Sequence, residues 1–277
     1  MATETRHTGA KRLLPRLPAL LAAGAGVAVA VALAAVGAGG GASEAIPGIP
    51  DAGAMTAWGL PVARTLTDVA AVATVGALLL VVVLLPGGRK LTATQLRYLN
   101  WAAVAAALWG AASVAALVFT LSDLFATPVA DIASPAVLAD FAITDTQGRS
   151  YALTAAAGGV IATFCVGVTT ARWARLALLL TLVGLLPPAF SGHSAASGNH
   201  DAAVTSLALH LLGVAVWVGG LVFVLVATAR REERAADAVR RFSPLAGGRC
   251  SRSAPAVWSA PPCGSRPRES CSAAPTG

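Results

Sequence analysis

Three of the four histidines in this 277-residue chain lie within 18 residues, where a polar segment becomes a long apolar one. They are His193, His200 and His210, in the stretch SGHSAASGNHDAAVTSLALHLLGVAVWVGGL, residues 191–221. Neutral imidazole is a ligand for copper, zinc, iron or nickel, so two loop histidines could bring a metal ion to a third one inside the apolar run. Solvated loop histidines and one hydrogen-bonded packing histidine would show the same spacing. Both interpretations stay open.

The spacing favours some metal groups over others. Nitrogen donors suit Cu(II), whereas Cu(I) prefers added thioether ligands, and only Met55 is expected on that side of the membrane. A membrane b-type haem needs two axial histidines that face each other from two helices. Because His210 alone lies within an apolar run, one chain does not supply such a haem site.

Membrane helices must position these histidines. The chain is 56% apolar and 12% charged, with a mean hydropathy of +0.71, and six apolar runs can cross a hydrocarbon core of about 30 Å. Since backbone polar groups in lipid must be satisfied within the span, each run predicts a helix. The predicted fold is an all-α polytopic transmembrane helix bundle. The expected spans are residues 17–37, 62–85, 101–121, 151–169, 175–189 and 204–227.

The charges of the connecting segments predict the orientation. If the N-terminus is cytoplasmic, the cytoplasmic segments hold most basic residues and the external loops hold most acids, as the positive-inside rule requires. The histidine loop is then external. The basic residues of the cytoplasmic segments are Arg6, Lys11, Arg12, Arg16, Arg89, Lys90, Arg97, Arg172, Arg175, Arg230, Arg231, Arg234, Arg240 and Arg241. The external acids are Glu44, Asp51, Asp123, Asp131, Asp140, Asp145 and Asp201.

The two ends of the chain leave alternatives open. Residues 1–16 are expected to be a cytoplasmic segment before a membrane domain over residues 17–241. The first apolar run, residues 17–37, is also compatible with a cleaved signal peptide, because a basic start precedes it and small residues follow. Residues 242–277 are rich in Ser, Pro, Arg and Cys and show no apolar period. They are interpreted as a disordered tail or as the product of a shifted reading frame.

The sixth span has a polar stripe. His210 is expected about 9 Å below the outer end of its helix, and polar residues at such depth usually face the bundle interior. Gly213, Trp217, Gly220 and Val224 share its stripe, which predicts that this face contacts protein. The glycines of the helix would let another helix approach closely. The faces expected to contact lipid carry Leu211, Leu212, Val218, Leu221 and Val222.

Other polar residues have two interpretations each. Arg64 and Asp68 are four residues apart and therefore face the same side of the second span. Asp68 could receive a cation beneath the histidines, or the two could form an interfacial ion pair with Arg64 extending toward water. Cys165 is expected to be a buried small residue, and the three cysteines of the tail match no metal-binding spacing. The four scattered Asp of the third loop, between the third and fourth spans, indicate a solvated face rather than a calcium site.

Two broad classes of function are not expected. The net charge of +7 is spread in short clusters without a basic domain, which argues against a nucleic-acid partner. The chain has no GxSxG, HExxH or phosphate-loop motif, and no nucleophile is clustered with a base, so it is predicted not to be an enzyme.

The histidine stretch 191–221 resembles the CopD-type copper resistance and copper transport membrane proteins. So do WGLPVARTLTDVAAVATVGALLL, residues 58–80, and DFAITDTQGRSYAL, residues 140–153. Actinobacterial members fused to a cytochrome oxidase assembly half are the most similar kind, and the likeness covers most of residues 50–246. Beyond RRFSPLA, which resembles the entry to the next family helix, the later spans and the assembly half are absent. The resemblance therefore implies a truncated member.

The resemblance also implies a function and a location. It implies a multi-pass protein of the bacterial plasma membrane that handles copper as its cargo, with His193, His200 and His210 as the candidate ligands. Cytochrome oxidase assembly factors are the implied protein partners. Two alternatives remain: an assembly or scaffold protein without transport, in which loss of the histidines leaves cellular copper unchanged, and a non-functional truncated product that accumulates poorly in membranes.

Overall fold

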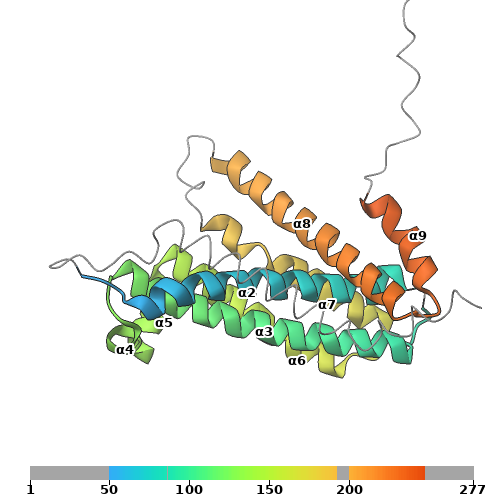
Figure 1. The fold of residues 1–277 in the computed structure, drawn as a ribbon, viewed down its shortest axis with the longest axis horizontal. Helices are drawn as coiled ribbons and strands as arrows, with labels where there is room; N and C mark the ends of the chain where they lie inside the picture. Colours follow the sequence, from blue (N-terminus) through green and yellow to red (C-terminus); the bar gives the residue numbers. More distant parts are fainter. Residues whose placement is uncertain (1–49, 86, 192–199, 247–277) are drawn as a thin grey trace, which may run out of the picture.

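The computed structural model describes residues 50–85, 87–191 and 200–246, which form a bundle of long helices (Figure 1). Five of its helical segments are long and apolar enough to cross a membrane. No strand occurs in these residues, and the sole β-type pairing among them is an isolated bridge between Lys90 and Thr170. This confirms the all-α polytopic architecture. The five segments are Ala54–Leu84, Ala93–Leu124, Thr146–Gly167, Ala171–Phe190 and Val204–Ala229.

The long helices follow the order of the expected spans. The first span, α2 (Ala54–Leu79), continues as the π-helical turn η3 (Leu80–Leu84) and is followed by α3 (Ala93–Leu124) and α6 (Thr146–Gly167). The fourth segment joins α7 (Ala171–Gly184) to the 3-10 turn η4 (Pro187–Phe190), and the fifth belongs to α8 (His200–Ala229). These five segments match five of the six expected spans. The remaining one, residues 17–37, lies outside the described residues.

Several helices begin earlier than the apolar runs predict, because polar caps extend them beyond the hydrocarbon. At the start of α3, the Thr92 side chain accepts from the Gln95 N–H while the Gln95 side chain accepts from the Thr92 N–H. This reciprocal capping box satisfies two donors that a helix start leaves free. At the start of α6, Asp145 Oδ1 accepts from the N–H groups of Gln147 and Gly148 at 2.8 and 2.9 Å. Hydropathy locates the membrane core of a helix and misses such ends.

The segment between α3 and α6 contains two short helices, α4 (Val129–Ile132) and α5 (Pro135–Thr144). The Ser134 hydroxyl caps α5 by accepting from the Val137 N–H at 3.3 Å, and Pro135 occupies the first turn, where its missing N–H costs nothing. On the other side of α5, Phe141 packs with Leu117 and Leu121 of α3 in a small apolar cluster. The segment therefore folds back over the end of the bundle.

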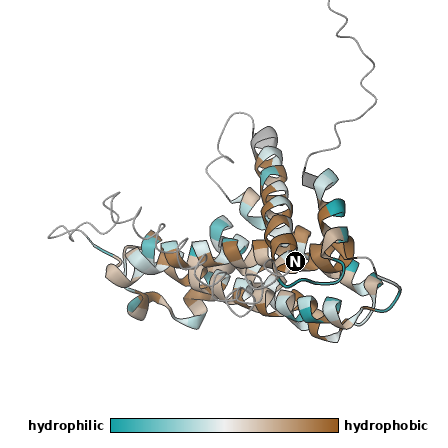
Figure 2. Ribbon diagram, turned by 45° about the vertical axis from the view of Figure 1, so that its right-hand side comes forward, coloured by the Kyte–Doolittle hydropathy of each residue, from teal (hydrophilic) through white to brown (hydrophobic). Residues whose placement is uncertain are grey.

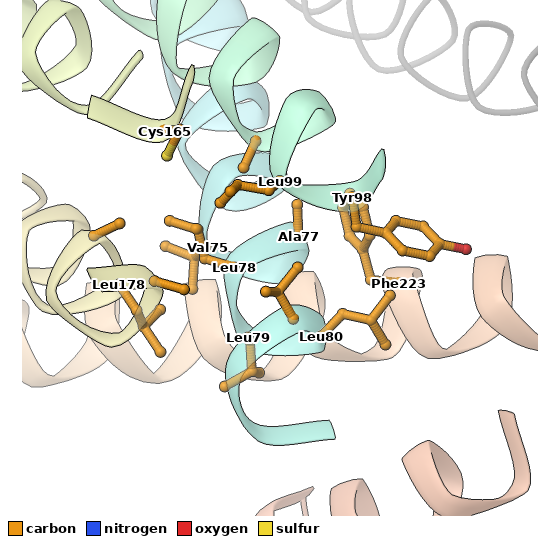
Figure 3. Packing of buried hydrophobic residues seen from close by; sticks show 14 of the residues in the cluster. Val75, Ala77, Leu78, Leu79, Leu80, Tyr98, Leu99, Cys165, Leu178 and Phe223 are labelled. Atoms are coloured by element: carbon orange, nitrogen blue, oxygen red, sulfur yellow. The ribbon is translucent and has the colours of Figure 1, made fainter. Parts of the chain in front are cut away.

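The main core surrounds the second half of α2. Figure 3 shows Val75 and Leu78 of α2 among Leu99 of α3, Cys165 of α6 and Leu178 of α7, all members of one buried cluster. Cys165 is 1% exposed, which confirms that it is a buried small residue. Two glycines lie where α3 and α6 cross. A Cβ atom added to Gly158 would lie 2.6 Å from the Gly110 nitrogen. The helices approach this closely because both positions are glycine.

The last two helices attach to the bundle from one side. α8 contacts α2 near Gly76 and Gly219, and its first half leans away from α2 (Figure 1). α9 (Ala235–Ala246) folds back against α8 and buries Ala238 and Phe242. The predicted end of the membrane domain, residue 241, lies inside α9. The next residue, Phe242, packs in the main core.

Candidate functional site

Three basic segments that are far apart in the sequence meet at one end of the bundle, here called the basic end. The backbone joins two of them: Leu91 N–H donates to the Thr169 carbonyl and Ala171 N–H to the Arg89 carbonyl, each at 3.1 Å. The third segment consists of the turn between α8 and α9 and the first turns of α9, where the Arg241 guanidinium donates to the Val83 carbonyl of η3 at 3.2 Å. The predicted clustering of basic residues is thus present in the fold.

The opposite end, called the histidine end, is where α2, α6 and α8 begin. His193 lies outside the described residues, and His200 is the first residue of α8, with its side chain outside them as well. His210 is an exposed residue of α8. It lies six residues after Val204, where the apolar segment begins, which is about 9 Å along the helix. The described helix keeps the spacing on which the expected depth of His210 depends, and the depth itself stays a prediction.

The direction in which His210 points differs from the prediction. The α8 face that contacts α2 carries Ala215, Gly219 and Phe223, which are buried, whereas His210, Gly213 and Trp217 are exposed. The expected stripe continues to Gly220 and Val224, which are buried. Its first half, from His210 to Trp217, is therefore turned away from α2, whereas its second half faces the protein as predicted. The correction has a physical reason: a Cβ on Gly219 would lie 2.6 Å from the Val72 carbonyl oxygen, so this glycine sets which side of α8 meets α2.

Arg64 and Asp68 are both exposed on α2. Arg64 Nε donates to the Tyr151 hydroxyl of α6 at 3.2 Å. No ion pair within 4.0 Å joins Arg64 to Asp68 among the ion pairs of the described residues, so the direct pair considered from the sequence is not formed. Arg64 instead ties the first half of α2 to the start of α6. The Asp68 carboxylate stays available at the surface of the bundle.

Asp68 and His210 lie at a similar height. α2 and α8 run in the same direction and cross where a Cβ on Gly76 would lie 2.3 Å from the Gly219 carbonyl oxygen. Asp68 precedes Gly76 by eight residues, about 12 Å, and His210 precedes Gly219 by nine residues, about 14 Å. Both ionisable groups therefore precede the crossing by a similar length of helix, on the side of the histidine end, where α8 leans away from α2 (Figure 1).

A hydroxyl network fastens this end. The hydroxyls of Thr56 in α2 and Ser122 in α3 are 2.7 Å apart, and Ser122 donates to the Thr127 carbonyl at 2.6 Å. Both residues are buried, at 1% and 0% exposure. Sequence reasoning missed this contact, since hydroxyl residues give no periodic signal in an apolar run. It holds α2 and α3 together at the histidine end of the bundle.

The basic end contains a polar cluster that the sequence did not single out. Glu232, 12% exposed at its side chain, accepts from the Arg97 guanidinium and from the Tyr98 hydroxyl, the latter at 3.1 Å. The Arg230 guanidinium stacks over the Trp101 ring at 4.5 Å. A signal existed in the sequence: Glu232 and Glu233 interrupt an otherwise basic segment. These contacts attach the end of α8 to the start of α3.

A cavity of about 180 Å³ opens beside this cluster. Its lining includes the oxygen-bearing residues Thr92, Thr94, Glu232 and Glu233. Oxygen donors suit hard cations more than copper, which prefers nitrogen and sulfur. The lining also includes Arg234, and the cavity therefore does not offer the donors that copper prefers.

The described residues do not contain a complete metal centre. Within them, no three side chains of His, Cys, Asp or Glu are close enough to share a metal ion. His210 offers one imidazole, and Cys165, the other soft donor of the membrane region, is buried in the main core. Any copper ligand set that includes His210 must therefore draw on donors beyond the described side chains or on a transient approach of groups such as Asp68.

Comparison with known proteins assigns the family. The chain matches the family described as copper resistance protein D-like, N-terminal domain, over residues 55–204. The match contains His193 and His200 and ends before His210 and the HLLGVAVWVGGL helix, which carried much of the resemblance in the sequence. No curated protein and no solved structure matches the chain. Because the match covers more than half of the sequence, this chain belongs to the copper resistance protein D-like family of multi-pass membrane proteins.

Proposed function

We propose that the chain binds copper ions at the histidine end and passes them into the membrane bundle toward the basic end, in a bacterial plasma membrane. The observation that carries the proposal is the family match, which includes the segment with His193 and His200. The charge distribution supports the orientation, since the basic end would be cytoplasmic. Copper is the cargo of this proposal and not a resident cofactor.

The heights of the polar groups suggest the order of events. His193 and His200 precede the membrane part of α8 and would meet an external ion first. His210 lies about 9 Å further along the helix, at the level of the exposed Asp68 carboxylate. Imidazole provides nitrogen donors for copper, and ionisable residues at this depth in membrane helices commonly mark an ion pathway.

Copper binding by the detergent-purified chain tests the proposal. The triple variant His193→Ala, His200→Ala, His210→Ala is expected to lose the stoichiometric copper binding of the unchanged chain. The matched control is His7→Ala, which removes the remaining histidine and is expected to bind normally. Equal binding by the triple variant, or none by either protein, would contradict the proposal.

The same assay predicts a pH dependence. Imidazolium cannot ligate a metal, so copper affinity should fall as the pH drops below the ordinary histidine pKa of about 6.5. Each of the three imidazoles must lose its proton before it can bind copper. The copper affinity should therefore fall more steeply with decreasing pH than it would for a single histidine ligand. Titrations between about pH 5 and pH 8 with the same copper buffer would measure it, and a constant affinity over this range would indicate other donors.

The alternative function is an assembly or scaffold role without copper transport. The outward direction of His210 favours it, because an exposed residue on a membrane helix also suits contact with another protein. Cellular copper content separates the two functions. Copper handling predicts that the triple histidine variant changes this content, whereas a scaffold predicts the same content and altered recovery of a partner protein.

A further inference from the structure

The first half of the membrane part of α8, residues 205–217, has an open face. Leu209 is 65% and Trp217 51% exposed, and His210 and Gly213 between them are exposed as well. A Cβ added to Gly213 would meet no atom within 4 Å. Since His210 precedes Gly219 by nine residues, or about 900° of helical rotation, it lies on the side of α8 opposite the contact with α2. This open face is distinct from the packed one.

The open face of α8 differs from other open faces of the bundle. Exposed side chains such as Val104 on α3 and Val160 on α6 are apolar and suit acyl chains. α8 is mostly hydrophobic along its length (Figure 2), yet its open face carries an imidazole about 9 Å into the apolar segment. Ionisable residues at such depth face protein or a water-filled cavity, because direct contact with lipid is costly. A protein segment packed on the open face of α8 would keep the imidazole out of contact with lipid.

The chain itself contains a segment suited to this face. Residues 17–37 form an apolar run of 21 residues, 12 of them Ala or Gly, and as a helix they would be about 32 Å long. Every fourth residue of one stripe is small: Ala22, Gly26, Ala30 and Ala34. Small residues at this spacing let a neighbouring helix approach closely. A stripe of small residues forms a shallow surface. The exposed Trp217 ring of α8 could pack into this surface, and the open space at Gly213 would let the two helices approach.

The connection to the bundle allows this placement. The run ends 16 residues before α2, which begins at Ala54 at the same end of the bundle as α8. Sixteen residues reach up to about 50 Å, more than one helix diameter of about 10 Å. We propose that residues 17–37 form a membrane helix that packs antiparallel to α8 and covers His210, Gly213 and Trp217. With the two segments centred at one depth, Gly26 would face Trp217 and Ala30 would face Gly213.

Cysteine cross-linking in native membranes tests the proposal. The four cysteines of the full chain are first replaced by serine or alanine, and a protease site is inserted within residues 39–43. The test variant carries Ala30→Cys and Gly213→Cys, and the matched control carries Ala30→Cys and Val160→Cys, at an exposed position of α6. After treatment with a short bis-maleimide and cleavage, the test fragments are expected to stay joined on a denaturing gel. The control fragments are expected to separate.

Each other result overturns the proposal. Separated fragments in the test variant would place residues 17–37 elsewhere, provided that the protein is present in membranes. If that variant does not accumulate, the pair Gly26→Cys and Trp217→Cys provides the same readout. A covalent dimer formed by Gly213→Cys alone would show that a second copy covers the face. Loss of residues 17–37 from the mature chain, detected by its mass, would mean that this run is a cleaved signal peptide.

Discussion

The two halves of α8 are attached to the bundle in different ways. The half toward the basic end contacts α2 through Gly219 and buries Phe223 in the main core. Beyond it, Glu232 links this end of the helix to Arg97 and Tyr98 of α3. The half toward the histidine end leans away from α2 and exposes His210 (Figure 1). One helix therefore combines an anchor with a surface that is open to a ligand or a partner.

This difference shows how a membrane helix can carry a polar group and still keep a fixed position in the bundle. Close glycine packing at one end supplies contacts along a short length of helix, and the polar network after it fixes the connection to α9. Among the described residues, the other half makes no close helix contact on the face that bears His210. The following predictions test this division, from the largest expected effect to the smallest.

Adding one methyl group at the anchor should destabilise the protein. In Gly219→Ala, the new Cβ would lie 2.6 Å from the Val72 carbonyl oxygen and 3.0 Å from the Gly76 nitrogen, so α8 must shift. We expect a loss of about 2–3 kcal/mol in the free energy of unfolding, as for other overpacked contacts. Thermal unfolding in detergent measures it. The control is Gly159→Ala on α6, where an added Cβ would meet no atom within 4 Å, and an equal loss in both variants would contradict the anchor role of Gly219.

The polar network at the basic end should contribute less. Glu232→Gln keeps the shape of the side chain but removes the charge that the Arg97 guanidinium contacts. Because Arg97 is 46% exposed, we expect a loss of about 1 kcal/mol, decreasing at high salt. The neighbouring exposed residue gives the control, Glu233→Gln. Equal stability of the two variants across salt concentrations would show that α8 does not depend on this network.

The histidine end should be held by α2 and α3 rather than by α8. Thr56→Val removes the hydroxyl that lies 2.7 Å from the Ser122 hydroxyl, while Ser122 keeps its bond to Thr127. The expected loss is about 0.5–1 kcal/mol, typical of one hydrogen bond between membrane helices. Thr163→Val, on the exposed side of α6, is the control. Proteolysis of the α3–α6 segment should also become faster in Thr56→Val only, and an unchanged rate would argue against this role.

The sequence predicted the spans because hydropathy and charge are properties of each segment alone. The expected runs 101–121 and 204–227 lie inside the observed spans Ala93–Leu124 and Val204–Ala229. The expected depth of His210 followed from the same runs. The short helices α4 and α5 were missed, although Ser134 followed by Pro135 is a typical helix start. Their shortness concealed them, because segments of 4 and 10 residues give too few turns for an apolar period and are too short to cross a membrane.

The direction of each helix face was decided by the tertiary structure. A helix that is hydrophobic on all sides, such as α8, has no apolar period that tells which side is buried. The sequence therefore determined the family, the number of described spans and the separation of charges between the two ends. The crossing at Gly76 and Gly219 decided that His210 points away from α2, because two backbones can approach closely only where both side chains are absent.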